Sequence, residues 1–439
     1  MKHEISLKDF NKVLDESNSA FLCGNGFSIN FDWDFRNIFD RLYAAHKELL
    51  YNSFYNVKGS TLFNKKCKQN YQNLKQHLRY LSEADLYKVF EDALIFAKSI
   101  QNSPKLLEDF SEMKLVDELV FKLSQIDILH QICDTGSKNG IRSVNIEYWP
   151  ILIHFYFAIK KINPSYYKFP ERNSFIDCVK MGDISVIKFE GGNDLIEKVI
   201  LNGFTIYYRL LFSIAIFSNG KAINFSLLEN IENLNLSKIN QFLEKFQALL
   251  TLNYDHILES VTNRKVIHIH GEYIKEEKEF VHNQSLGMNS KYGLISFSDI
   301  LIGDFFTLKH KSNVVSYFAS KNSPVNKPME LASNKIGKII CNKKINTFVI
   351  FGMSIANDQH ILRDIMTSFY TEQVENPQII YCYFTEEERE TFSEQYQLCI
   401  TFSEKLNKYV ENIKVKYVKT EDIRNVYFLK RKTAEVGFE

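Results

Sequence analysis

The feature that most constrains the fold is a long helical stretch between two groups of strand-like segments. An apolar run from Ser19 to Cys23 stops at Gly24, which is typical of a strand that enters a glycine turn. Strand-like runs return at Ala248, and the residues between have apolar side chains at helical spacing. Because strands that alternate with helices favour a parallel sheet, we predict an α/β core interrupted by a large, mostly helical insertion.

Further strand candidates follow in the last part of the chain, and helical stretches separate several of them. They are residues 248–252, 265–270, 347–351, 378–384 and 415–418. The polar segment 272–344 is predicted to be irregular. We therefore assign residues 1–37 and 247–439 to the core and residues 38–246 to the insertion.

Composition excludes several classes of protein. The 439 residues carry 54 Lys and Arg against 53 Asp and Glu, and a net charge of +1 gives no general attraction to nucleic acid or membranes. No apolar run reaches the ~18–20 residues that span a bilayer, and the nearest, from Phe204 to Phe217, predicts a buried helix. Seven scattered cysteines without a C-x-x-C pair, and a start unlike a secretory signal, predict a cytoplasmic protein with reduced thiols.

The first motif is the glycine turn Gly24-Asn25-Gly26-Phe27-Ser28. Backbone N–H groups in such a turn can face a pyrophosphate, because glycine has no Cβ to block the approach. The motif lacks the third glycine of the common dinucleotide fingerprint. The alternative is an ordinary tight turn after a strand.

The second motif is Thr251-Leu252-Asn253-Tyr254-Asp255, at the end of a predicted strand. Asn253 and Asp255 are two residues apart, so on an extended segment they share one face. At the carboxyl end of a parallel strand, that face looks into the ligand crevice. An amide there can orient a water or a ribose hydroxyl, and a carboxylate can accept hydrogen bonds from a carboxamide. The alternative is a turn stabilised by Asn and Asp side chains.

The third motif is the alternating run Val266-Ile267-His268-Ile269-His270-Gly271. The alternation predicts His268 and His270 on one face, and Gly271 leaves His270 at the strand tip, where an imidazole can act as a general base. No carboxylate or third histidine stands at a convincing ligand spacing, so we expect no metal. The alternative is a pair of histidines without a function.

The fourth motif is an apolar strand that ends at Gly352-Met353-Ser354. A glycine followed by a hydroxyl side chain suits contact with a ribose or phosphate. The alternative is a strand-to-helix turn in which Ser354 caps the next helix.

The order of these motifs resembles the sirtuin superfamily, and most closely the sirtuin-like proteins of bacterial anti-phage defence. The glycine turn looks like the family's G-A-G-x-S, with Asn25 in place of alanine. Asp34-Phe35-Arg36 follows about where the family has P-D-F-R, with Trp33 in place of proline. The second motif looks like T-x-N-x-D, the third like the strand that carries the catalytic histidine, and Gly352-Met353-Ser354 like G-T-S. The resemblance covers about residues 18–37 and 247–385, and it implies a Rossmann-like sheet of sirtuin type.

The resemblance also implies roles for individual residues toward NAD⁺. Asn253, Asp255 and His270 would be catalytic: the amide would position the attacking group, the carboxylate would hold the carboxamide, and the imidazole would be the base. The remaining matched residues would bind the cofactor; these are Gly24, Asn25, Gly26, Ser28, Asp34, Phe35, Arg36, Thr251, Gly352 and Ser354.

One departure from the family bears on activity. Protein-deacylating sirtuins carry a zinc module of two cysteine pairs, whereas only Cys341 lies between His270 and Gly352 here. We therefore expect no zinc. The implied activity is NAD⁺ hydrolysis to nicotinamide and ADP-ribose, used to deplete NAD⁺ when a defence signal arrives. The alternatives are an NAD-dependent protein deacylase and a non-catalytic sensor of NAD or ADP-ribose.

The resemblance also implies an assembly that controls the activity. We expect a homo-oligomer or a complex with an operon partner, such as a HerA-type ATPase or a pyrophosphatase-like nucleotide-sensing subunit. Aromatic side chains in the insertion indicate either a partner surface or the insertion's own core; they are Phe155, Tyr156, Phe157, Tyr207 and Tyr208.

Overall fold

The computed structural model describes residues 3–51, 56–58, 62–116, 124–183, 195, 198–199, 202–275, 287–290, 293–297, 332–355, 358–399 and 404–430. The chain divides into two compact units. The first comprises Met1–Arg36, Gly220–Glu272 and Glu330–Glu439, and the second comprises Asn37–Asn219 and Tyr273–Met329. The division differs from the predicted bounds in three places: residues 220–246 belong to the first unit, whereas Asn37 and residues 273–329 belong to the second.

The first unit contains a seven-stranded sheet in which every pair of neighbours is parallel. The predicted α/β class and parallel sheet are thus confirmed. In spatial order the strands are β1 (His3–Glu4), β11 (Lys414–Lys419), β10 (Gln378–Tyr383), β9 (Thr347–Phe351), β2 (Ser19–Cys23), β4 (Ala248–Thr251) and β5 (Ile267–His268).

The direction in which strands are added to the sheet reverses beside β2. From β2 the chain adds β4 and then β5 on one side, and afterwards adds β9, β10 and β11 on the other. Crossovers that leave in opposite directions from neighbouring strands open a crevice at the carboxyl ends of those strands. The chain leaves β2 toward β4 and leaves β9 toward β10, so in this sheet the point of reversal lies between β2 and β9.

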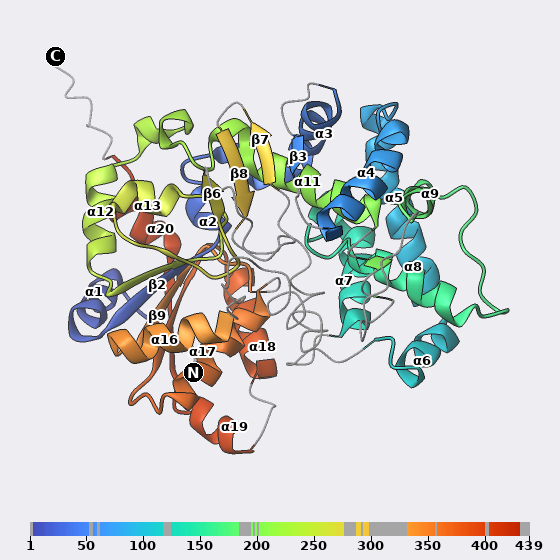
Figure 1. The fold of residues 1–439 in the computed structure, drawn as a ribbon. Helices are drawn as coiled ribbons and strands as arrows, with labels where there is room; N and C mark the ends of the chain where they lie inside the picture. The colour runs from blue at the N-terminus through green and yellow to red at the C-terminus, as the bar shows by residue number, and fades with distance from the viewer. Residues whose placement is uncertain are drawn as a thin grey trace, which may run out of the picture. The chain divides into compact units, whose positions relative to one another are not determined.

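Alternation along the strands gives each face of the sheet its own hydrophobic core. Ala20 and Leu22 of β2 belong to one cluster of buried residues, whereas Phe21 and Cys23 belong to another. The first cluster includes residues of α16 (Ala332–Lys343), α17 (Gln359–Thr371), α18 (Glu386–Cys399) and α19 (Glu404–Val410). The second includes residues of α1 (Leu7–Glu16), α12 (Leu236–Glu244), α13 (Ile257–Thr262) and α20 (Thr420–Ile423). Helices therefore cover both faces of the sheet (Figure 1).

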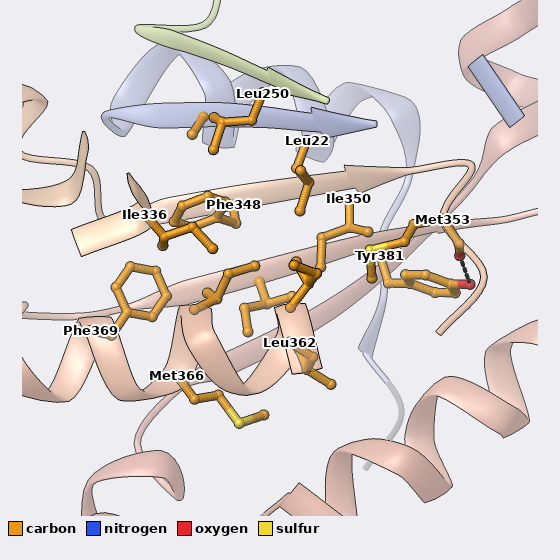
Figure 2. Packing of buried hydrophobic residues seen from close by; sticks show 14 of the residues in the cluster. Leu22, Leu250, Ile336, Phe348, Ile350, Met353, Leu362, Met366, Phe369 and Tyr381 are labelled. Carbon is orange, nitrogen blue, oxygen red and sulfur yellow. Dashed lines mark hydrogen bonds between the residues drawn. The ribbon is translucent and has the colours of Figure 1, made fainter. Parts of the chain in front are cut away.

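The first of these clusters also fixes the chain segment that follows β9. Figure 2 shows Leu22, Phe348 and Ile350 of the strands in the same cluster as Leu362 and Met366 of α17. The hydroxyl of Tyr381 donates a hydrogen bond of 3.1 Å to the carbonyl of Met353. This bond holds the turn that leaves β9 at the carboxyl edge of the sheet.

The second unit is mainly helical and contains a small antiparallel sheet in the order β3-β7-β8-β6. Three of its strands lie in the segment predicted to be irregular, so that prediction was wrong: the strands are only three to five residues long and stand among polar residues. They are β6 (Tyr273–Lys275), β7 (Gly287–Ser290) and β8 (Gly293–Phe297), and β3 is Asn56–Lys58. The helices are α3 (Leu42–Leu50), α4 (Leu62–Leu78), α5 (Glu83–Gln101), α6 (Pro104–Glu112), α7 (Gln125–Asn139), η2 (Ile141–Ser143), α8 (Ile151–Ile162), α9 (Ser174–Met181) and α11 (Gly203–Phe217).

The most apolar helix of this unit is buried along its whole length. Every residue of α11 is buried, which confirms the helix predicted for residues 204–217. The five aromatic residues that indicated either a partner surface or a core are also buried, on α8 and α11. They lie in the hydrophobic core of the second unit, so of the two alternatives the insertion's own core is correct. No described helix is both long enough and apolar enough to cross a membrane.

Short turns of helix complete the chain. They are α2 (Asn25–Ser28), η1 (Trp33–Arg41), η3 (Ser218–Gly220), η4 (Phe225–Leu227), η5 (Ile231–Asn233) and η6 (Arg424–Phe428).

Candidate active site

Four neighbouring strands of the first unit carry the four predicted motifs at their carboxyl ends. In the sheet register Cys23 lies beside Thr251 on one side and Phe351 on the other, and Thr251 lies beside His268. The residues that follow these positions therefore emerge along one edge of the sheet. Motifs 228 positions apart in the chain are brought together in this way.

The glycine turn packs backbone against backbone on the end of β9. A Cβ atom at Gly26 would lie 2.5 Å from the Cα of Gly352, and one at Gly24 would lie 2.8 Å from the carbonyl oxygen of Gly352. Gly352 has a φ of +61°, which also favours glycine. All three glycines are needed for this close approach.

Two amide groups of the turn bond to the backbone that ends β9. The N–H of Gly24 donates to the carbonyl of Phe351 at 3.1 Å, and the N–H of Gly26 donates to that of Gly352 at 2.8 Å. These two N–H groups join β2 to β9 and do not face a phosphate. The glycines thus act by letting the two strand ends meet.

Asn253 is held at the centre of a hydrogen-bonded group that we call the strand-end cluster, which comprises Gly24, Ser28, Thr251, Asn253 and Asp255. Its side-chain amide Nδ2 donates to the carbonyl of Gly24 at 3.1 Å and to Oγ of Ser28 at 2.7 Å. Its backbone N–H donates to Oγ1 of Thr251 at 3.1 Å. The residue is 4% exposed, and its side-chain oxygen Oδ1 has no hydrogen-bond partner within the described part of the chain. Since buried polar atoms are nearly always hydrogen-bonded, this oxygen is an acceptor ready for a ligand donor.

Asp255 is linked to Asn253 through Ser28. The hydroxyl of Ser28 donates to Oδ2 of Asp255 at 2.7 Å, and the N–H of Ile257 donates to Oδ1 at 3.0 Å. The second bond, to a residue two positions ahead, is the turn that was the alternative for this motif. Burial raises the pKa of Asp255 to about 6, and the two hydrogen bonds limit the rise. Asp255 therefore orients Ser28 and stabilises the start of α13.

His268 lies among carboxylates. Its Nδ1 donates to the carbonyl of Asn253 at 2.8 Å, and its Nε2 lies 2.6 Å from Oε1 of Glu259. Both partners are acceptors, so both ring nitrogens donate and the ring is positively charged. Burial lowers the pKa of His268, but the hydrogen bond to Glu259 and the charges of Glu259 and Glu272 outweigh burial and raise the pKa overall.

His270 contacts a second histidine, so the two histidines of the motif do not share a partner. Its Nε2 lies 2.9 Å from Nε2 of His360, and the rings stack at 17° with centroids 5.1 Å apart. Burial, with His360 and Lys335, lowers the pKa of His270 well below its usual range. Burial and Arg363 lower the pKa of His360 to about 4. Both rings are neutral near pH 7, and a neutral imidazole can accept a proton.

Several other matched residues have exposed side chains. These are Asn25, Asp34, Arg36 and Ser354. The guanidinium of Arg36 lies 4.0 Å from the ring centroid of Trp33, while Phe35 is buried. Ser354 is not a helix cap, because α17 begins after Asp358, whose side chain makes no capping bond. The alternative in which Ser354 caps the next helix is therefore wrong.

Sequence reasoning missed the residues that surround the two histidines. Glu259 and Glu272 lie beside His268, and Lys335 donates to the carbonyls of His268 and Ile269 at 2.8 and 3.1 Å. His360 is on α17, 90 positions from His270. Glu272 follows the H-x-H-G run directly, and this was the one signal available in the sequence.

Three groups of described side chains have the composition of a metal site. They are His256, His268 and Glu272; His270, Asp358 and His360; and Asp32, Asp34 and Glu229. In the third group a cation is already supplied by the chain, because the ammonium of Lys221 lies 3.4 Å from Asp32 and pairs with Glu229.

Comparison with known proteins gives no relative: no family model, no curated protein and no solved structure matches this chain. The geometry of the strand-end cluster is therefore the basis on which a function is assigned.

Proposed function

We propose that this protein is an NAD⁺ glycohydrolase of sirtuin type, which releases nicotinamide and ADP-ribose. The observation that carries the proposal is the buried, unpartnered Oδ1 of Asn253. The amide nitrogen of the same side chain is fixed by two hydrogen bonds, so the oxygen has a set direction. A ribose hydroxyl or a water molecule is a donor of the right size for this acceptor.

The strand order supports a dinucleotide as the ligand. Counted along the chain, the strands from β5 to β11 have the order 3-2-1-4-5-6, which is the order of doubly wound dinucleotide folds. In those folds the ligand lies across the point of reversal, which here is between β2 and β9. Asn253 follows β4, and Gly352 follows β9.

The proposed reaction needs an orienting amide and a base. Water attacks C1′ of the nicotinamide ribose, the C1′–N bond breaks, and its electron pair leaves with neutral nicotinamide. The proton of the attacking water passes to His270, whose lowered pKa keeps the imidazole neutral at pH 7. Asn253 orients the water or the ribose, and Ser28 and Asp255 hold Asn253 in place.

The proposal includes the control of activity that the resemblance to sirtuin-like defence proteins implies. The enzyme is held inactive until a defence signal arrives, in an oligomer or in a complex with a HerA-type ATPase or a pyrophosphatase-like subunit. Nicotinamide release should therefore be measured with and without the products of neighbouring genes.

The test is nicotinamide release by variants of Asn253 under the condition that activates the wild type. Asn253→Ala should lower the rate ~100-fold or more, because a reactant displaced by about 1 Å from its productive position reacts about that much more slowly. Asn73→Ala, an exposed asparagine on α4, is the matched control and should leave the rate unchanged. NAD⁺ should still shift the thermal unfolding of Asn253→Ala, since binding residues remain.

Other outcomes separate the alternatives. Nicotinamide release only in the presence of an acylated peptide would identify a deacylase. Binding of NAD⁺ without any release, with every partner present, would identify a sensor.

A further inference from the structure

We propose that His256, His268, Glu259 and Glu272 bind a structural zinc ion behind the strand-end cluster. Two imidazoles and two carboxylates are a ligand set that Zn²⁺ takes in tetrahedral geometry. The proposal does not depend on NAD⁺ hydrolysis. The expectation that no metal binds rested on the absence of cysteine pairs and of a carboxylate or third histidine at a convincing ligand spacing, whereas the fold places two carboxylates beside His268.

The separations between His256, His268 and Glu272 fit a tetrahedral site, and Oε1 of Glu259, 2.6 Å from Nε2 of His268, would move apart from it as the ion replaces the proton between them. Oε2 of Glu272 lies 3.5 Å from Nε2 of His256 and 3.7 Å from Nε2 of His268. Ligands at ~2.1 Å from a zinc ion stand about 3.4 Å apart along the edge of a tetrahedron. The imidazole rings of His256 and His268 have centroids 5.4 Å apart. The ligand atoms of His256, His268 and Glu272 all lie within 4.8 Å of one another.

The surroundings of His268 are those of a metal ligand. A ligating histidine usually donates its other ring N–H to a backbone carbonyl or a carboxylate, which fixes the ring. Here Nδ1 of His268 donates to the carbonyl of Asn253, so Nε2 points to the carboxylates. Zinc would replace the Nε2 proton at this position.

A carboxylate oxygen of Glu259 is a separate observation that favours a cation at this site. Its Oε1 contacts His268, but its Oε2 is buried and has no hydrogen-bond partner within the described residues. A buried carboxylate oxygen without a donor is costly, and a cation would satisfy it. The side chains of His256 and Glu272 are 30% and 37% exposed, so an ion can enter from solvent.

The bound zinc ion would stabilise the chain segment that carries Asn253. The four ligands come from α13, from β5 and from the residues next to them, and His268 is bonded to the backbone of Asn253. Four protein ligands leave no position for a reactive water, so the ion stabilises the segment and does not take part in chemistry.

The experiment is a zinc titration of the full chain after treatment with a chelator, followed by calorimetry and by thermal unfolding. The wild type should bind about one zinc ion per chain and unfold at a higher temperature with zinc than without. Glu272→Gln and His256→Ala should weaken binding ~100-fold or more, because loss of an outer-shell partner alone weakens metal binding 10–100-fold.

Matched controls locate the ion. His77→Ala, an exposed histidine on α4, and His360→Ala, in the second group of potential ligands, should bind zinc like the wild type. If His256→Ala does not fold, Glu272→Gln decides, since it keeps the shape of the side chain. The proposal is overturned if the wild type binds no zinc, or if His360→Ala loses the ion while Glu272→Gln keeps it.

Discussion

His268 and His270 stand two residues apart in one motif, yet their surroundings give them opposite properties. His268 lies between two carboxylates and carries a raised pKa, so it is held as a charged ring. His270 stacks on another histidine with a lysine nearby, and its pKa is lowered well below the usual range. The charged ring is suited to hold structure, and the neutral ring is suited to accept a proton. The difference shows that a histidine's role follows from the side chains packed around it.

The largest effect should come from removal of the neutral ring. His270→Ala should lower nicotinamide release by ~10²–10⁴-fold, which is the usual contribution of a general base. The measurement is the rate under the condition that activates the wild type, with His77→Ala as the control. Full activity in His270→Ala would refute the proposed mechanism.

Removal of the charged ring should instead affect stability. His268→Ala in zinc-free protein deletes the bond to Asn253 and leaves Glu259 without its cation, so the free energy of unfolding should fall by ~2–4 kcal/mol. His270→Ala should cost less, because it leaves no buried charge behind. Urea unfolding of both variants at pH 7 compares them directly, and equal losses would contradict the distinction.

The smallest effect concerns pH. His360 has a folded-state pKa of about 4, below the ~6.5 of an unfolded histidine, so its contribution to stability is present above pH 6.5 and is lost as the pH falls toward 4. Between pH 7.5 and 5.5 the wild type should therefore lose about 1 kcal/mol more than His360→Gln. The measurement is the free energy of unfolding at both pH values. An identical pH dependence in the two proteins would mean that His360 is not buried in its neutral form.

The strand ends could be predicted from the sequence because each is a local pattern. Apolar runs that stop at Gly24, Gly271 and Gly352 mark the ends of β2, β5 and β9 to within a few residues. The α/β class follows from their alternation with helices. The two-residue strand β1 could not be found, because His3 and Glu4 have no apolar pattern and pair only with β11.

The partners of the candidate site could not be predicted for a physical reason. His360 reaches His270 only because α17 packs on the sheet beside β9, and nothing local in the sequence encodes that contact. The glycines were found, but their close packing against Gly352 was not predicted. A glycine that lets a neighbouring backbone approach and a glycine that lets a phosphate approach cannot be distinguished in the sequence.

The placement of β2 also has a consequence for synthesis on the ribosome. Its five residues are all buried, and both of its neighbours, β4 and β9, are translated more than two hundred positions later. At ~5–20 residues per second, β2 waits on the order of 10–50 s for its first partner. The helices from α3 to α11 emerge during that interval, whereas the apolar N-terminal strand remains without its sheet. In a nascent chain the apolar side chains of β2 therefore stay without their sheet partners until residues far along the chain have been synthesised.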